Sequence, residues 1–178
     1  MLSNSRFDHL VIAVPDLQGY VEQSATSLGV EPVDGGAHLG LGTANALLGL
    51  ELADELTESL GLARPSCSNP LTYLEILGPD PEQDPALAAS RLAGITEPTV
   101  QRWAIRPDDF DGLVTAAARS QEPRVRLGEV HDMTRRRPDG TVLDFFGIAL
   151  DIIAPGGQEG ETEGLHAHLK GPGGSWTL

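Results

Sequence analysis

One local pattern occurs twice in this chain: an apolar, strand-like run, a proline and an aspartate, and then a segment with helical spacing of apolar residues. The first copy begins with FDHLVIAVPDL at 7–17 and the second with VQRWAIRPDDF at 100–110. Proline interrupts a strand because it lacks an amide proton, and aspartate is a favoured N-cap of a following helix. Superposing IAVPD on AIRPD gives an offset of 92 residues. The repeat predicts two related modules.

After its strand, the first copy continues with a predicted helix from Leu17 to Leu28, which Gly29 ends. Three predicted strands follow: the glycine-rich EPVDGGAHLGLG, then TANALLGLE, then LTYLEILGP. Together they make a βαβββ unit. The segment 52–70, between the last two strands, is predicted to be an insertion.

The second copy again predicts a strand and a helix, followed by RVRLGEVHDMTRRRPDG, TVLDFFGIAL and DIIAP. YLEILGP at 73–79 superposes on ALDIIAP at 149–155 with an offset of 76, and the two offsets differ by 16, about the length of the insertion. We therefore predict a first module, a linker with a short helix near Pro85 to Leu92, a second module and a glycine-rich, largely flexible tail. Their predicted bounds are 1–78, 79–99, 100–155 and 156–178.

The composition argues against several classes of partner. The formal net charge is −14, from 12 basic and 26 acidic residues. Such a surface repels phosphate backbones and anionic bilayers, so neither nucleic acid nor a membrane is expected. The single cysteine, Cys67, allows no internal disulfide, and the apolar run near the N-terminus is too short for a signal peptide. A cytoplasmic location is expected.

Four stretches in this order, FDHLVIAVPDL, GGAHLGLGTANALLGL, YLEILGPDP and RRRPDGTVLDF, resemble the glyoxalase-like domain family of the vicinal oxygen chelate superfamily. The resemblance extends to about residue 155. It implies an α+β fold in which two tandem βαβββ modules form curved mixed sheets that close around a shared cavity. In metal-using members, up to four residues from the first and fourth strands of each module hold a divalent ion in that cavity.

The resemblance places the first-module ligands on His9 and Glu75. The residues agree with it, because a glutamate within LTYLEIL needs a hydrogen-bonding, ionic or metal partner if it is buried. Imidazole and carboxylate together suit Zn, Fe, Mn or Ni. The alternatives are an arginine partner for Glu75 and a hydrogen-bonded core position for His9.

The second module departs from this pattern. The offsets of 92 and 76 place Gln101 and Asp151 at the corresponding positions. Glutamine is a weak ligand and aspartate a short one, so a cavity without any metal is an equal alternative. In another alternative the final strand is 164–171, and His166 or His168 takes the fourth position.

Further candidates for substrate contact are His38, Asn45, Trp103, Arg135 and Arg137. His38 lies among glycines that permit close approach of a ligand, or it caps a turn. Asn45 faces the cavity or an edge, and Trp103 is a cavity wall or core. The two arginines share a strand face and suit a carboxylate or phosphate group, unless they lie on an exposed hairpin.

Two functional classes follow. The first is a divalent-metal-dependent isomerase, lyase or ring-cleaving dioxygenase that acts on an oxygen-bearing and, given the arginines, anionic substrate, with Glu75 as the catalytic group. The second is a metal-free protein that binds or sequesters a small molecule. The apolar strand edges are also compatible with a homodimer.

Overall fold

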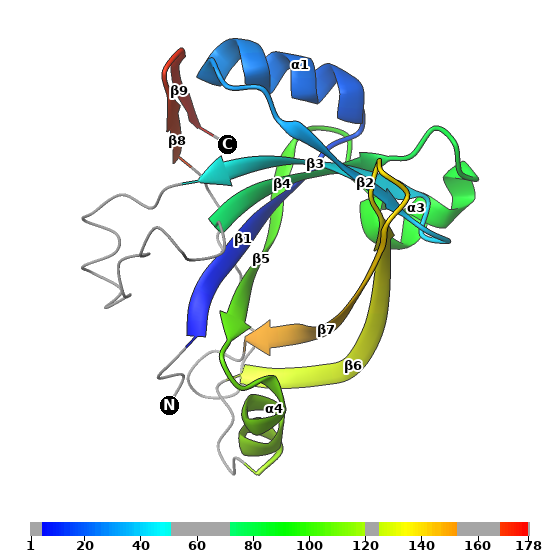
Figure 1. The fold of residues 1–178 in the computed structure, drawn as a ribbon, viewed down its shortest axis with the longest axis vertical. Helices are drawn as coiled ribbons and strands as arrows, with labels where there is room; N and C mark the ends of the chain where they lie inside the picture. The colour runs from blue at the N-terminus through cyan, green and yellow to red at the C-terminus, as the bar shows by residue number, and fades with distance from the viewer. Residues whose placement is uncertain (1–4, 51–71, 120–124, 153–167, 178) are drawn as a thin grey trace.

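The computed structural model of the chain describes residues 5–50, 72–119, 125–152 and 168–177 (Figure 1). In chain order the elements are β1 (Ser5–Ala13), α1 (Leu17–Leu28), β2 (Val33–His38), β3 (Thr43–Leu50), β4 (Thr72–Pro79), α3 (Pro85–Leu92), β5 (Thr99–Pro107), α4 (Phe110–Ala118), β6 (Val125–Arg136), β7 (Val142–Ile152), β8 (His168–Gly171) and β9 (Gly174–Thr177). They form a mixed α+β fold. Its main sheet has the strand order β5-β1-β4-β3-β2-β6-β7, and β8 and β9 form a separate hairpin.

The first half of the chain folds as predicted. Helix α1 has the predicted bounds, because the Asp16 side chain accepts a hydrogen bond from the Gly19 amide at 3.1 Å and Gly29 adopts a left-handed conformation. Strand β1 pairs in parallel with β4, which pairs antiparallel with β3, and β3 pairs antiparallel with β2. The predicted linker contains α3 with the predicted bounds. The insertion predicted over 52–70 lies outside the described residues.

The second half repeats the strand and helix and then differs from the prediction. Helix α4 is capped by Asp109, whose side chain accepts a hydrogen bond from the Gly112 amide at 2.8 Å. Strand β7 runs to Ile152 and pairs antiparallel with β6, so residues 149–152 continue one strand. The separate final strand predicted to begin at 149 is therefore wrong for these residues. The physical reason is that no turn-forming pair interrupts the apolar run of β7.

The two halves meet along β1 and β5, which pair antiparallel, and at one backbone position at the other side of the first half. Strand β2 pairs with β6 through Ala37 and Arg136. Gly36, with φ +111°, lies against the carbonyl oxygen of Arg136, where a Cβ atom would come within 1.9 Å. Helix α4 packs against both β5, which is one end of the sheet order, and β6, which is next to the other end (Figure 1).

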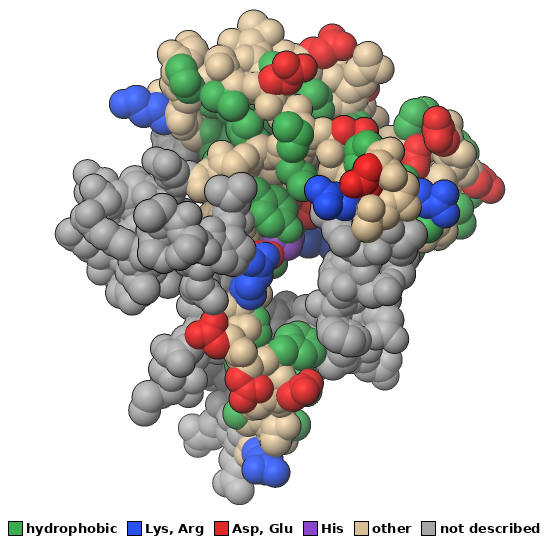
Figure 2. Space-filling model, viewed as in Figure 1, with side chains coloured by type: hydrophobic (Ala, Val, Ile, Leu, Met, Phe, Trp, Pro, Cys, Tyr) green, Lys and Arg blue, Asp and Glu red, His purple; other side chains and the backbone are tan. Residues whose placement is uncertain are grey.

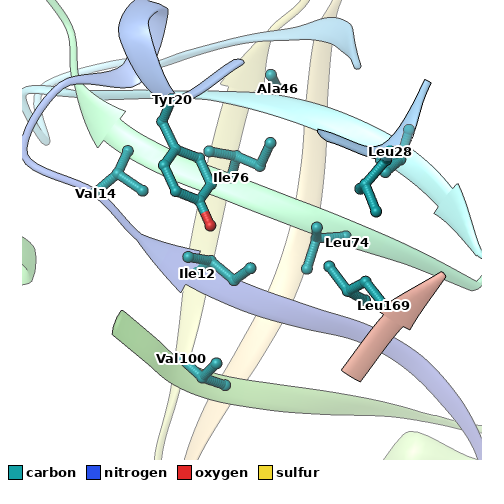
Figure 3. Packing of buried hydrophobic residues seen from close by; sticks show 10 residues of the cluster. Ile12, Val14, Tyr20, Leu28, Ala46, Leu74, Ile76, Val100 and Leu169 are labelled. Atoms are coloured by element: carbon teal, nitrogen blue, oxygen red, sulfur yellow. The ribbon is translucent and has the colours of Figure 1, made fainter. Parts of the chain in front are cut away.

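The hydrophobic core lies between the sheet and α1 (Figure 3). Ile12, Leu74 and Ile76 are fully buried there and pack with Tyr20 and Leu28 of the helix. Because successive strand residues point to opposite faces, this core uses every second residue of β1 and β4.

Residues 168–177 form a hairpin against α1, although they belong to the segment that the sequence predicts to be largely flexible. Leu169 joins the core, and the Trp176 ring stacks on Tyr20 with the centroids 4.9 Å apart. The Gly173 amide donates a hydrogen bond to the Leu28 carbonyl at 2.8 Å, and the absence of a side chain permits that approach. Leu169, Trp176 and the close approach at Gly173 thus hold residues 168–177 against α1.

No helix among the described residues is long and apolar enough to span a membrane.

Candidate functional site

The face of the sheet opposite α1 carries polar side chains within otherwise apolar strands. On β4, Leu74 and Ile76 belong to the core, so Tyr73 and Glu75 point to the other face. His9 on β1 and Asn45 on β3 alternate with core residues in the same way. Figure 2 shows a histidine (purple) in a hollow, with basic side chains (blue) on either side of it.

Glu75 lies at the centre of this group. Its Oε1 accepts a 2.5 Å hydrogen bond from Nδ2 of Asn45. His9 Nε2 lies 3.5 Å from the other oxygen, Oε2, and His38 Nε2 lies 3.7 Å from Oε1. The Glu75 side chain is only 13% exposed. Four residues that the sequence singles out, His9, His38, Asn45 and Glu75, are therefore brought together.

The orientation of His9 is set by its own neighbours. Its Nδ1 lies 2.9 Å from Oδ2 of Asp8, and its ring stacks on Tyr73 with the centroids 4.7 Å apart. An ionised carboxylate only accepts hydrogen bonds, so the proton of a neutral His9 belongs on Nδ1. Nε2 then faces Glu75, and this contact is attractive only when a proton or another cation lies between the two groups. Asp8 is in turn paired with Arg106.

His38 and Asn45 lie behind Glu75. His38 Nδ1 is 3.0 Å from the hydroxyl of Thr43, and Asn45 Nδ2 is 3.5 Å from His38 Nε2. Both side chains are buried, so they support the carboxylate more directly than they face a substrate. The Oδ1 atom of Asn45 is buried without a hydrogen-bond partner among the described residues. Gly35 makes room for this amide, since a Cβ there would lie 2.2 Å from Oδ1.

Strand β5 pairs antiparallel with β1, and the pairing is irregular. His9 pairs with Ala104 and Val11 pairs with Arg102, and a register shift follows before Ile12. The two capping aspartates, Asp16 and Asp109, are 93 residues apart, as are the two capped glycines. This spacing places Arg102, one residue after the predicted Gln101, at the position that corresponds to His9.

Gln101 is engaged elsewhere. Its Nε2 donates to the backbone carbonyl of Arg91 at 2.8 Å, and its Oε1 accepts from Nε of Arg102 at 3.0 Å. Asp151 lies on β7, paired with Arg126 at the far end of the sheet order, and its side chain lies outside the description. The structure thus brings two of the four predicted metal ligands, His9 and Glu75, into contact.

The other predicted substrate contacts are not part of this group. Trp103 pairs with Leu10, which packs on the α1 side, and is 39% exposed. Arg137 is exposed in the turn between β6 and β7, where its amide donates to Thr141. This matches the hairpin alternative. Backbone and side-chain hydrogen bonds from Thr141, and the charge of Arg137, lower the pKa of Asp139 in the same turn. The Arg135 side chain and His166 lie outside the description, and His168 begins β8.

The donor set among the described residues does not complete the metal site that the resemblance implies. No group of three or more His, Cys, Asp or Glu side chains in this part of the chain is arranged to hold a metal ion. At the position corresponding to His9 stands Arg102, and a guanidinium has no lone pair to offer a metal.

Four charged residues near the site were not among the predicted ones: Asp8, Arg91, Arg102 and Arg106. Arg91, in the last turn of α3, is partly buried. Burial and the charge of Arg102 lower the pKa of its guanidinium, and the charge of Glu75 raises it. The alternation of Arg102 and Arg106 about Ala104, which puts both on the His9 face, is the sequence signal that could have found two of them.

A family model described as a glyoxalase-like domain matches residues 7–161. No curated protein matches the chain. Similar solved structures include a methylmalonyl-CoA epimerase in complex with methylmalonyl-CoA and NH4+, at 20% identity over 80% of this chain and 94% of that one, with a TM-score of 0.47. A Streptomyces coelicolor methylmalonyl-CoA epimerase variant in complex with 2-nitronate-propionyl-CoA is 21% identical over 79% of this chain and 92% of that one, with a TM-score of 0.47. The Mycobacterium tuberculosis methylmalonyl-CoA epimerase is 23% identical over 79% of this chain and 77% of that one, with a TM-score of 0.41.

Proposed function

Because the chain belongs to the glyoxalase-like domain family of the vicinal oxygen chelate superfamily, we propose that it is an enzyme that moves a proton on an oxygen-bearing small molecule, with Glu75 as the acid-base group. The observation that carries the proposal is the surroundings of Glu75, a largely buried carboxylate within reach of two imidazoles and one amide. Burying a carboxylate costs free energy, and an apolar side chain would pack at this position without that cost. Clusters of this kind are typical of functional sites.

In this proposal each residue has a separate role. The hydrogen bond from Asn45 holds Oε1, so the second oxygen, Oε2, is the one that takes a proton from carbon next to a carbonyl group. His9, oriented by Asp8, presents Nε2 on the Oε2 side, where its protonated form donates a hydrogen bond to the oxygen that becomes negative. Return of the proton from Glu75 to the resulting enolate completes an isomerisation, whereas departure of a group bonded to the adjacent carbon, with its bonding electrons, completes a lyase reaction.

The finer predictions of the fold belong to the same proposal. Two βαβββ modules that close around a shared cavity would place a substrate between this face and β6 and β7. The contacts of α4 with both β5 and β6 support the closure. A divalent ion at His9 and Glu75 has no part in the proposed steps, because the described donors do not complete its site.

A second candidate function is a small-molecule binding protein without catalysis. The position of Arg102 favours it, because an arginine that corresponds to His9 offers anion binding instead of acid-base chemistry.

Deuterium exchange separates the two functions. The protein is incubated in D2O with a panel of 2-oxo acids, 2-hydroxy ketones and 1,3-dicarbonyl compounds, and exchange at the acidic carbon is followed by proton NMR. The wild type is expected to accelerate exchange of at least one compound, and Glu75→Gln to slow it by about 100-fold or more. The matched control is Glu22→Gln, the same chemical change on the exposed side of α1, which should exchange like the wild type.

Two results would argue against the enzyme. Exchange by Glu75→Gln at the wild-type rate would remove Glu75 from the chemistry. Saturable binding of panel members without any exchange would favour the binding protein.

A further inference from the structure

Glu75 has apolar neighbours on the β3 side of the sheet. Leu47 of β3 pairs with Glu75 of β4, and Val33 of β2 pairs with Leu47. Directly paired residues point to the same face of a sheet, so all three side chains share the face opposite α1. The residues on either side of Leu47 along β3, Ala46 and Leu48, point to the core instead. Leu47 and Val33 therefore form an apolar row that begins at the acid-base group.

A β-bulge selects the valine for this apolar row. The register of β2 against β3 shifts between Asp34 and Gly36, and Gly35 has no partner in it. The shift exchanges the two faces for the residues that precede it, so Val33, and not Asp34, shares the face of Leu47. The Asp34 side chain accepts a hydrogen bond from the Gly36 amide at 2.9 Å, which stabilises the bulge. Without the bulge, the charged aspartate would stand beside Leu47.

Both side chains of the apolar row keep surface that the fold does not cover. Val33 is 63% exposed, the largest value among the exposed large hydrophobic residues of the described chain. Leu47 is half-buried, although Ala46 and Leu48 beside it are buried. A Cβ atom at Gly35 would lie 3.0 Å from Cγ of Leu47, so the glycine leaves room for this side chain. Single exposed apolar residues are common, but this exposed pair adjoins a largely buried carboxylate.

We infer that the apolar row of Leu47 and Val33 binds an alkyl chain of the small-molecule substrate. The inference rests on the proposed function, because it takes the reacting carbon of that substrate to lie against Glu75. Neighbouring strands are about 4.8 Å apart, so the chain meets Leu47 first, and it reaches Val33 roughly 10 Å from the Glu75 backbone. Each covered methylene group removes apolar surface from water and strengthens binding. The substrate class is then a carbonyl compound with an apolar side chain.

Isothermal titration calorimetry with the straight-chain 2-oxo acids from pyruvate to 2-oxooctanoate, at constant ionic strength, tests the inference. These compounds share the 2-oxo acid group and differ in the length of the alkyl chain. The wild type is expected to bind the longer acids more tightly, by about two- to fourfold for each added methylene group that reaches the apolar row. An affinity that does not rise with chain length, or a wild type that binds no member of the series, would overturn the inference.

Two variants locate the effect on the apolar row. Leu47→Ala should weaken the binding of 2-oxooctanoate by about tenfold and leave that of pyruvate nearly unchanged. Val33→Thr adds a hydroxyl with almost no change of shape, and should weaken only the longer acids, by about threefold. The matched controls should bind like the wild type: Leu87→Ala on the exposed side of α3, and Val30→Thr, next to the Gly29 that contacts the β8–β9 hairpin.

The wild-type dependence on chain length in both Leu47→Ala and Val33→Thr would also overturn the inference. Circular dichroism reports whether each variant folds. Val33→Thr, at a largely exposed residue, decides the outcome if Leu47→Ala does not fold.

Glu75→Gln separates the inference from the proposed function. It should stop deuterium exchange of the bound 2-oxo acids and keep the dependence of affinity on chain length, because the apolar row is intact. Exchange that continues in this variant, with binding weakened in Leu47→Ala and Val33→Thr, refutes the proposed function alone. Exchange that stops in this variant, with an affinity that is independent of chain length, refutes the role of the apolar row alone.

Discussion

The two faces of the sheet at β1, β3 and β4 are made from alternate residues of the same strands, yet they differ in character. Toward α1, Ile12, Leu74 and Ile76 are fully buried in an apolar core. On the opposite face, His9 and Glu75 form a polar group with Asn45. Successive residues of a strand point to opposite faces, so one short segment can serve both faces. On β4, Leu74 and Ile76 stabilise the core, and Glu75 between them belongs to the site.

The largest expected effect comes from breaking the apolar face. Leu74→Ala is expected to lower the free energy of unfolding by about 2–5 kcal/mol, because the fully buried side chain leaves a cavity. Urea denaturation measures the change, with Leu87→Ala on the exposed side of α3 as the control, which should cost about 0.5 kcal/mol or less. A loss no greater than that of the control would show that this face does not carry the stability.

A smaller effect is expected from crowding the polar face. Gly35→Ala places a Cβ against Oδ1 of Asn45, so it should cost about 1–3 kcal/mol and displace the amide that holds Glu75. Denaturation and deuterium exchange are measured on the same samples. Gly49→Ala is the matched control, a strand glycine with open space around its Cβ position, and should lose neither stability nor exchange. Equal behaviour of the two variants would contradict the role of Gly35.

The smallest expected effect concerns a polar atom on the apolar face. The Tyr20 hydroxyl is buried without a hydrogen-bond partner among the described residues, so Tyr20→Phe should stabilise the protein by about 1 kcal/mol.

The same variant has a predicted pH dependence. Burial raises the pKa of Tyr20 above its ordinary value of 10.0. The wild type should therefore lose stability as the pH rises above about 10, because the unfolded chain releases this proton first. Thermal unfolding between pH 8 and 11 measures the difference, and Tyr20→Phe should lose less over this range. A wild type and variant that differ by a constant amount across it would contradict this assignment.

The sequence predicts the first half well because its signals are local. Asp16 and Gly29 delimit α1, and the alternation within LTYLEILGP puts Glu75 opposite the core. The second half repeats the helix signal at Asp109 and lacks such signals after it. No turn separates the two parts of β7, and the irregular pairing of β5 with β1 joins strands far apart in the chain.

Contacts between distant elements could not be read from the sequence for the same reason. The hydrogen bond from the Gln101 side chain to the Arg91 carbonyl depends on where α3 ends against β5. The pairing of Asp8 with Arg106 depends on the antiparallel register of β1 and β5. Either contact requires the assembled sheet, which no local pattern encodes.

The hairpin of β8 and β9 has a consequence for synthesis on the ribosome. Its residues Leu169 and Trp176 complete a core whose other members, such as Tyr20, are translated about 150 residues earlier. A nascent chain can pair β1 with β4 once residue 79 has emerged, but the outer side of α1 stays uncovered until 168–177 leave the exit tunnel. During that interval Tyr20 and Leu28 are open to chaperones, and the closing contact has one of the longest sequence separations in the fold.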